Sequence, residues 1–393
     1  MEPRPRPLAV AVNALLCVLS LCVSAAEAEN VTTYDAKNFG AKGNGVDDDT
    51  KALVAAWKKA CGTPGTVTLV IPPGTYYIGP AHFHGPCEAL AITFLLQGVL
   101  MAATDLKRFG NDWIEFGWVT NLTVVGQNGG VIDGQGAASW PFNKCPVRKD
   151  CKVLPTNTVV RDITSVNSKF FHIALLHNNN MRMSNLRIHA PENSPNTDGI
   201  HIERNTGVII SDSRIGTGDD CISIGQGNHN IYIARVHCGP GHGMSVGSLG
   251  RYVGEGDVTS IHVTDMTFQG TMNGVRIKTW ENSPTKSLAA RMLFENMVMK
   301  DVQTPIIIDQ KYCPYYNCEH RYVSGVTLED IKFKNIKGTS TLPVAVLLRC
   351  GVPCHGVVLQ NVDLIYNGQA GTLSHCENAN ATYVGYQHPK PCV

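Results

Sequence analysis

The sequence predicts an all-β protein, a single-stranded right-handed parallel β-helix with a short capping helix near the amino terminus. Two observations support this prediction. Glycine makes up 38 of the 393 residues, and the apolar runs are short and separated by Asn, Asp and Gly, which favour turns over long helices. In addition, a five-residue pattern recurs in the middle of the chain, as expected for a protein built from stacked structural repeats.

The repeated pattern runs polar, small, apolar, small or polar, apolar. Its four copies begin at Asp198, Asp220, His242 and Asn273, so successive copies lie 22, 22 and 31 residues apart. An offset of 22 residues fits one coil of a parallel β-helix, and the third offset predicts a coil with a nine-residue insertion. These segments lack the 3.6-residue periodicity that a helical solenoid would show.

Stacking of the copies predicts which side chains meet. Paired strands lie about 4.8 Å apart, so Asp198, Asp220 and His242 are expected to form one polar column. Arg276 and Lys278, two residues apart on one strand, should point to the same side. The apolar residues two positions after each start are expected to form an interior ladder: Ile200, Ile222, Met244 and Val275.

Residues 1–28 are predicted to be a secretory signal peptide. Arg4 and Arg6 precede the apolar run 8–23, and small residues follow as far as Ala28. A transmembrane anchor is the alternative, but the run is short, and no later stretch of about twenty apolar residues follows it. We therefore expect a secreted protein without a membrane anchor, whose β-helix domain spans residues 29–393.

The single predicted helix begins near residue 50. Asp49 or Thr50 can cap it, and capping also accounts for the run of three aspartates at 47–49 better than a metal site does. The apolar residues of this segment fall on one helical face: Ala52, Leu53, Ala56, Trp57 and Ala60.

The cysteines predict disulfide bonds. Of the fourteen, Cys17 and Cys22 lie in the signal peptide, and the remaining twelve are an even number in an exported chain. Spacing alone leaves their connectivity open. A zinc site is the alternative, but the closely spaced pair Cys350 and Cys354 has no second pair at zinc-finger spacing.

The net charge and the sequence motifs indicate which kinds of ligand and modification to expect. The formal net charge is +1 and Lys and Arg form no block, so nucleic acid is not expected as a partner. Fourteen histidines would make the protein more cationic in acid, which favours an anionic substrate. Asn30, Asn121 and Asn380 lie in acceptor motifs for N-glycosylation.

Three aspartates are the candidate catalytic groups. Taken singly, Asp198 is more often a turn residue, and Asp219 and Asp220 are more often a solvated strand end. Together they are brought into one small patch by the repeat, and like charges so close raise at least one pKa, which keeps a carboxylic acid protonated. His242 is a candidate partner that sets the protonation of a carboxylate.

Two cationic residues belong to the candidate site, and they bear on whether the aspartates bind a metal. Arg276 and Lys278 would ordinarily be a solvated strand face, but beside the aspartates they are suited to binding a substrate carboxylate. Calcium is the alternative use of clustered carboxylates, and the two nearby cations disfavour it. We therefore expect no metal and no cofactor.

Four segments carry a family resemblance: Asn196-Thr-Asp198, Gly218-Asp-Asp220, Gly241-His-Gly243 and Arg276-Ile-Lys278. In this order and spacing they resemble the signature motifs of polygalacturonases, glycoside hydrolase family 28. The segment 38–50 also resembles the opening of pectin-active β-helix proteins. In detail the chain is similar to the plant pollen exopolygalacturonases.

The resemblance implies a secreted, monomeric enzyme of the plant cell wall that hydrolyses the α-1,4 linkages of pectic polygalacturonate and releases galacturonate. The implied mechanism is inverting and needs no metal. Asp219 would be the general acid, while Asp198 and Asp220 would hold and deprotonate the attacking water. His242 would support the acid. Substrate binding would fall to Arg276, Lys278, Tyr312 and Asn196.

The resemblance also implies three disulfide bonds, Cys221–Cys238, Cys350–Cys354 and Cys376–Cys392. Extending the same neighbour pairing gives Cys61–Cys87, Cys145–Cys151 and Cys313–Cys318. Three other functions stay open on the sequence: an endo-acting hydrolase, a calcium-dependent pectate lyase on the same fold, and a non-catalytic β-helix that binds wall polysaccharide or acts as a surface antigen and allergen.

Overall fold

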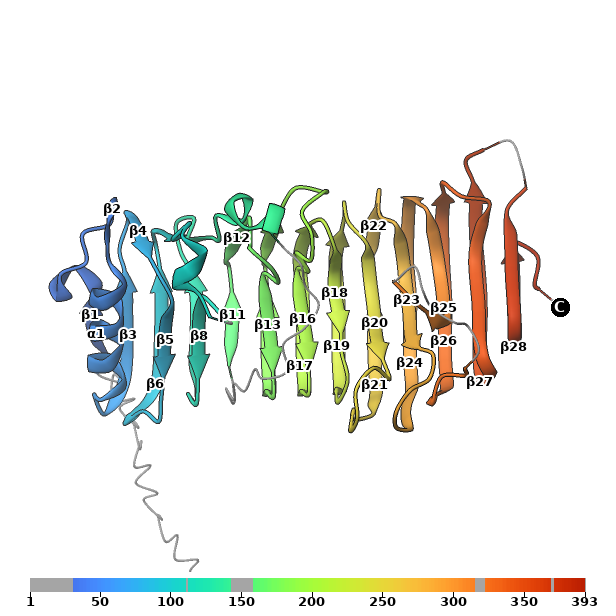
Figure 1. Cartoon of the computed structure of the whole chain (residues 1–393), viewed down its shortest axis with the longest axis horizontal. Coiled ribbons are helices and arrows are strands. Elements are labelled where there is room, and N and C mark those ends of the chain that lie inside the picture. Colours follow the sequence, from blue (N-terminus) through green and yellow to red (C-terminus); the bar gives the residue numbers. More distant parts are fainter. Residues whose placement is uncertain (1–30, 111, 143–157, 315–321, 369–370, 393) are drawn as a thin grey trace, which may run out of the picture. The chain divides into compact units, whose positions relative to one another are not determined.

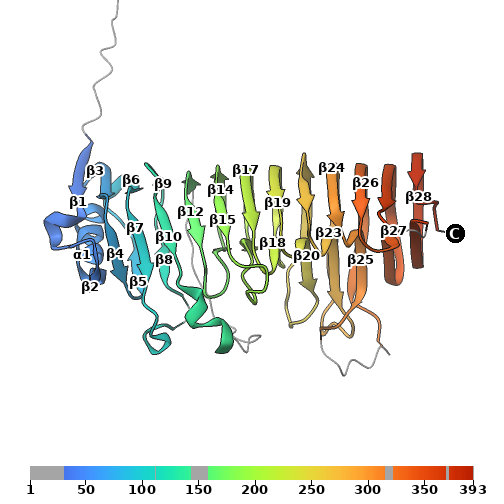
Figure 2. The same cartoon turned by 90° about the horizontal axis from the view of Figure 1, so that it is seen from above.

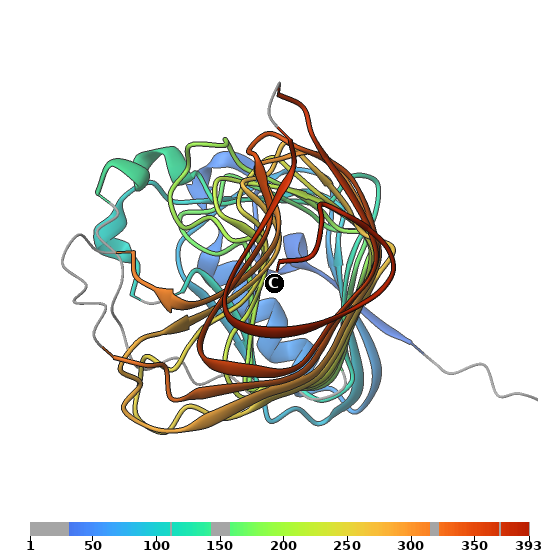
Figure 3. The same ribbon diagram turned by 90° about the vertical axis from the view of Figure 1, so that its right-hand side faces the viewer.

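The structure is a computed structural model that describes residues 31–110, 112–142, 158–314, 322–368 and 371–392. The chain is a right-handed parallel β-helix, as the sequence predicted. Its coils follow one another from the amino-terminal helix to the carboxy-terminal strand (Figures 1 and 2). Seen along the stack, they superpose (Figure 3).

Each coil contributes strands to up to three parallel series. The first series comprises β1 (Thr32–Asp35), β3 (Gly65–Ile71), β6 (Ala89–Leu96), β9 (Leu122–Gly126), β11 (Val159–Arg161), β14 (Asn179–Ser184), β17 (Thr206–Gly216), β19 (His229–Cys238), β21 (Val258–Thr264), β24 (Ser287–Val302) and β26 (Val326–Ser340). The second comprises β2 (Asn44–Asp48), β4 (Thr75–Ile78), β7 (Val99–Ala102), β10 (Val131–Asp133), β12 (Thr164–Val166), β15 (Arg187–His189) and β22 (Thr267–Gln269), and the long strands β17, β19, β24 and β26 continue into it.

The third series carries the polar site described below. It comprises β13 (Ile173–Leu176), β16 (Ile200–Glu203), β18 (Asp220–Ile224), β20 (Gly243–Leu249), β23 (Asn273–Trp280), β25 (Thr304–Tyr312), β27 (Val344–Tyr366) and β28 (Leu373–His388). From His355 onward β27 pairs with β26 and so continues the first two series. Strands β5 (Ala81–His84) and β8 (Ile114–Gly117) occupy the same step of their coils but pair only with each other among the described strands.

The repeat predicted the register of these strands correctly at its apolar positions. Ile200 pairs with Ile222, Ile222 with Met244, and Met244 with Val275, and all four side chains are buried. Most of the long third offset lies between Val246 on β20 and Ile261 on β21, which are 15 positions apart and include the loop 250–257. Their counterparts in the preceding coil, Ile224 and Ile231, are only 7 positions apart.

The predicted polar column is wrong at its third member. Asp220 pairs with Gly243, and the register then shifts so that Ile222 pairs with Met244. Asp220 and Cys221 together therefore face one residue, as in a β-bulge. The shift places His242 beside Asp219 instead of Asp220, and the His242 N–H donates to the Asp219 carbonyl at 2.9 Å.

The bends between series explain the Asn and Asp residues of the sequence. Left-handed backbone, which Asn and Asp tolerate better than most residues, recurs at corresponding bends: Asn185, Asp212, Asp265, Asn296, Asn335 and Asn361. At another bend the side chains of Asn178, Asn205 and Asn228 form a buried ladder. The carboxamide oxygen of each later member accepts the backbone N–H of the one before it.

The capping helix α1 (Thr50–Cys61) lies at the first coils, with Leu53, Ala56, Trp57 and Ala60 buried and Ala52 partly buried, as predicted. Asp49 precedes it but does not cap it, because its carboxylate accepts the N–H groups of Lys42 and Gly43. The short 3-10 helices are η1 (Ala36–Phe39), η2 (Leu106–Arg108), η3 (Gly136–Ala138) and η4 (Trp140–Phe142).

Four of the expected disulfides are present: Cys61–Cys87, Cys221–Cys238, Cys350–Cys354 and Cys376–Cys392. Cys145, Cys151 and Cys318 lie outside the described residues, so those two pairings stay predictions, although Cys313 is disulfide-bonded.

Two further predictions fall partly outside the described residues. The signal peptide and Asn30 lie there, whereas Asn121 and Asn380 are exposed, as an acceptor site requires. No helix in the described part of the chain is long and apolar enough to cross a membrane.

Candidate active site

The candidate site lies at the beginning of consecutive third-series strands, β16, β18 and β20, near the middle of the stack (Figure 1). Two turns are locked together there. The Thr197 hydroxyl accepts the N–H of Gly218 at 3.0 Å, and a Cβ at Gly218 would lie 2.0 Å from the carbonyl oxygen of Ser194. Only glycine permits this approach, so the turn before Asp219 and Asp220 is fixed against the turn before Asp198.

Asp198 is a buried carboxyl group whose surroundings favour its protonated form. It is 6% exposed, and its Oδ2 accepts a hydrogen bond of 2.6 Å from the Ser223 hydroxyl. Burial, followed by the negative charges of Asp219 and Asp220, raises the pKa of Asp198 well above its ordinary value of 3.8.

Asp219 and His242 form a charge pair. Nδ1 of His242 lies 2.9 Å from Oδ1 of Asp219. Burial opposes ionisation of Asp219, but the hydrogen bond from His242 and the charges of His242 and Lys278 outweigh it and lower the pKa of Asp219. The same hydrogen bond raises the pKa of His242 above 6.5. The pair is therefore ionic in the free site at mildly acidic pH.

Asp220 is bound on both oxygens. Oδ1 accepts a hydrogen bond of 2.7 Å from the Ser245 hydroxyl, and Oδ2 lies 2.9 Å from Nζ of Lys278. The side chain of Asp220 is 3% exposed and that of Lys278 is 11% exposed. Burial opposes the charge of Lys278, but the attraction of Asp220 outweighs it and raises the pKa of Lys278.

Arg276 and Tyr312 lie beside this pair. The guanidinium of Arg276 and the ammonium of Lys278 approach the Tyr312 ring at 4.9 and 5.5 Å from its centre, so both cations point to the same side, as predicted. Nε of Arg276 is buried and has no hydrogen-bond partner among the described residues. A buried guanidinium N–H of this kind is a ready donor for an anionic ligand.

The structure thus brings together Asp198, Asp219, Asp220, His242, Arg276, Lys278 and Tyr312. Asn196 differs from these, because it lies in the turn before Asp198 with a left-handed backbone, φ 53°. A turn that requires this conformation favours asparagine for a backbone reason alone.

Sequence reasoning missed four further residues of the site. Ser223 and Ser245 bind the carboxylates, and both occupy the fourth position of the repeated pattern, which was a usable signal. Arg251 lies over the Trp280 ring at 4.9 Å, and Trp280 makes an edge contact with Tyr312. No motif marks this pair, because Arg251 comes from the loop 250–257.

A metal ion fits this cluster poorly. Ligand atoms of Asp219, Asp220 and His242 lie within 4.8 Å of one another, a spacing that can hold a cation. However, the ammonium of Lys278 already binds Asp220, and a divalent ion there would meet a like charge.

Comparisons with known proteins match most of the chain. A model of the glycosyl hydrolases family 28 matches residues 61–386. An exopolygalacturonase of Platanus acerifolia is 43% identical over 370 residues, which cover 91% of this chain and 97% of that protein. An exopolygalacturonase of Oenothera organensis is 45% identical over 361 residues, which cover 88% and 98%.

Among solved structures, the endo-xylogalacturonan hydrolase of Aspergillus tubingensis superposes with a TM-score of 0.74 at 21% identity, over 90% of this chain and 100% of that one. At this identity the similarity supports the fold alone.

Proposed function

Because the chain belongs to glycosyl hydrolases family 28, we propose that it is an exo-acting polygalacturonase, which hydrolyses α-1,4 linkages of polygalacturonate and releases galacturonate. One observation carries the proposal. Three carboxyl groups in different electrostatic environments share a small site with two cations, which suits acid–base cleavage of an anionic sugar polymer. The relatives named exopolygalacturonase support the exo mode.

We assign the general acid to Asp219. Its side chain is 18% exposed, against 3% for Asp220, so of these two it is the carboxyl group more open to a glycosidic oxygen. In the free site its pKa is lowered, which by itself disfavours an acid. Bound galacturonate would add a negative charge and exclude water, and both effects raise the pKa of a carboxyl group. The proton of His242, 2.9 Å away, can then pass to Asp219.

We assign the water-activating role to Asp220, with Asp198 as its neutral partner. The Asp220 carboxylate, which lies 2.9 Å from the ammonium of Lys278, can take a proton from water. Asp198, whose pKa is raised, can position that water through a hydrogen bond. Attack from the face opposite the acid would invert the anomeric centre, and no step requires a metal or cofactor.

Substrate recognition falls to Arg276 and Tyr312. The unpartnered Nε of Arg276 can bind the carboxylate of galacturonate, and the Tyr312 ring holds the guanidinium in place. Lys278 adds positive charge to the same subsite while it remains bound to Asp220. Substrate binding by Asn196 stays a prediction from the family resemblance, since its left-handed backbone has a conformational reason of its own.

We further propose that the protein is secreted to the plant cell wall and acts there as a monomer. The predicted signal peptide, the disulfide bonds and the exposed acceptor residues Asn121 and Asn380 support export. The plant exopolygalacturonase relatives support the cell wall and pectic polysaccharide as the setting.

A product profile tests the function. Purified protein is incubated with polygalacturonate and a chelator, and the products are resolved by mass, with Asp219→Asn as the inactive variant. We expect saturated galacturonate monomer from the wild type and none from the variant. A ladder of saturated oligomers would show that the enzyme is endo-acting instead of exo-acting. Products one water lighter that appear only with calcium would show a lyase, and no products under any condition would favour a non-catalytic binder.

A further inference from the structure

We propose a second site, a zinc site formed by His82, His84 and Glu115 on the small sheet β5–β8. Ligand atoms of these three residues lie within 4.8 Å of one another. The site is independent of the proposed hydrolase function, and it departs from the expectation, based on sequence, that the protein has no metal site.

Strand geometry puts the three ligands on one face. His82 and His84 alternate with the buried residues Ala81 and Phe83, so both imidazoles point away from the core. Glu115 on β8 pairs directly with His82. The two imidazole rings lie beside each other, 5.3 Å between centres and 11° between planes.

A glycine makes room for this arrangement. Gly117 is the cross-strand partner of His84, and a Cβ at that position would lie 3.1 Å from Cδ2 and 3.3 Å from Nε2 of the His84 ring. Because Gly117 has no side chain, the imidazole can lie over β8 and reach Glu115. Nε2 of His84 comes within 3.1 Å of Oε2 of Glu115.

The contacts of His84 resemble those of a metal ligand more than those of a hydrogen-bonded histidine. Its Nε2 is shielded from solvent and makes no hydrogen bond among the described residues, despite the nearby Glu115 oxygen. A buried polar atom without a partner calls for an explanation such as a missing ion. A cation between the nitrogen and the oxygen would satisfy both.

The distances suit zinc. Ligands about 2.0–2.2 Å from a tetrahedral zinc ion lie roughly 3.3 Å from one another. Here Nε2 of His84 lies 3.1 Å from Oε2 of Glu115, close to this spacing, and Nε2 of His82 lies 4.0 Å from the same oxygen. Imidazole and carboxylate ligands together favour zinc over calcium, which takes oxygen ligands.

The charge around the site also permits a cation. In the described part of the chain, the ion pairs of His82, His84, Asp112 and Glu115 are all with one another. Among the described residues no ammonium pairs with these carboxylates, in contrast to Lys278 at the catalytic cluster.

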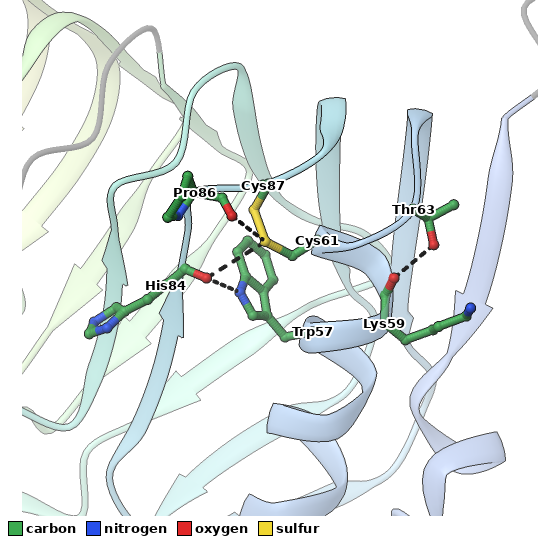
Figure 4. Close-up of a disulfide and its surroundings, with 7 residues drawn as sticks. All are labelled: Trp57, Lys59, Cys61, Thr63, His84, Pro86 and Cys87. Carbon is green, nitrogen blue, oxygen red and sulfur yellow. Dashed lines mark hydrogen bonds between the residues drawn. A yellow bond between two sulfur atoms is a disulfide. The ribbon is translucent and has the colours of Figure 1, made fainter.

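The backbone of His84 is held rigidly from the other side. Its carbonyl oxygen accepts the indole N–H of Trp57 at 3.0 Å and lies next to the Cys61–Cys87 disulfide (Figure 4). The imidazole extends away from the Trp57 indole in the same view, and it makes an edge contact with the Trp118 ring at 4.8 Å. A bound zinc ion would tie β5 to β8 and so fasten the coils next to helix α1.

Zinc binding to the full-length mature protein tests this site. Metal-free wild type is titrated with zinc by calorimetry, and its thermal unfolding is followed with and without zinc. We expect one zinc equivalent whose affinity falls at least tenfold in His84→Asn and in Glu115→Gln. Saturating zinc should raise the unfolding midpoint of the wild type by a few degrees and leave that of the variants unchanged.

The matched control is His262→Asn. His262 also faces a glutamate on the next strand, with Nε2 3.0 Å from Oε1 of Glu295, but without a second histidine. This variant should bind zinc as the wild type does. Circular dichroism and zinc-free activity verify that each variant folds. Unchanged zinc affinity in both His84→Asn and Glu115→Gln, or equal loss in His262→Asn, would overturn the proposal, as would wild type that binds no zinc.

Discussion

Nζ of Lys278 lies 2.9 Å from Oδ2 of Asp220, across two strand pairings, and both side chains are buried. A cation expected to serve the substrate is thus already bound to a carboxylate of the protein. The two cations of the site therefore differ: Lys278 is bound to Asp220, whereas Nε of Arg276 has no hydrogen-bond partner among the described residues. Four predictions follow from these different environments.

Lys278→Met should destabilise the protein by about 3–5 kcal/mol, because it leaves Asp220 buried without a counter-charge. Activity should also fall, because the carboxylate assigned to activate water loses the ammonium that holds it in place. Urea unfolding measures the first effect. Adding Asp220→Asn to Lys278→Met should recover most of the lost stability but none of the activity. Equal unfolding midpoints for wild type and Lys278→Met would show that the pair contributes nothing.

His242→Gln should remove a pH-dependent stabilisation. The raised pKa of His242 means that its contribution is complete below pH 6.5 and is lost as pH rises through the pKa of the folded state. The lowered pKa of Asp219 means that its contribution is present above pH 3.8 and is lost as pH falls through its own folded value. The free-energy difference between wild type and variant should therefore be largest between pH 3.8 and 6.5. A difference that is independent of pH would contradict the ion pair.

Asp198→Asn should stabilise the protein. The raised pKa of Asp198 means that the unfolded state loses this proton more readily, so wild-type stability falls as pH rises above 3.8. Asparagine has the same shape, accepts the Ser223 hydrogen bond and does not ionise. Unfolding at several pH values should show a gain that grows from pH 3.8 upward. A variant less stable than wild type at neutral pH would show that the carboxyl group is not held protonated.

Arg276→Lys should raise KM for polygalacturonate at least tenfold, because a lysine keeps the charge but loses the planar, multiply donating guanidinium. Its stability should change little, since Nε of Arg276 has no protein partner among the described residues. Arg235→Lys is the control, as Arg235 forms an exposed pair with Asp212 away from the site. An unchanged KM would remove Arg276 from substrate binding.

The local repeat was enough to predict the coils but not the contact of His242. The ladder from Ile200 to Val275 follows from periodicity, because a slip of one residue would turn each apolar side chain outward. His242 was placed on Asp220 by the same counting. The bulge at Cys221, whose side chain is tied inward to Cys238, adds one residue and moves His242 to Asp219.

The repeat could not predict contacts between residues that lie on loops or on separate coils. Arg251 reaches Trp280 from an insertion whose length was predicted but whose path was not. His82 and Glu115 lie 33 positions apart without a motif, and only the pairing of β5 with β8 brings them together. Such contacts depend on where a loop returns to the stack, which side-chain packing decides.

The order and spacing of residues along the chain determined the β-helix, its interior ladder, the family and the set of charged residues in the site, because each is a local pattern repeated at a fixed interval. The tertiary structure decided which carboxylate each cation binds and therefore which group is protonated. Those pairings depend on a one-residue bulge and on burial, and neither can be read from the spacing of the repeats.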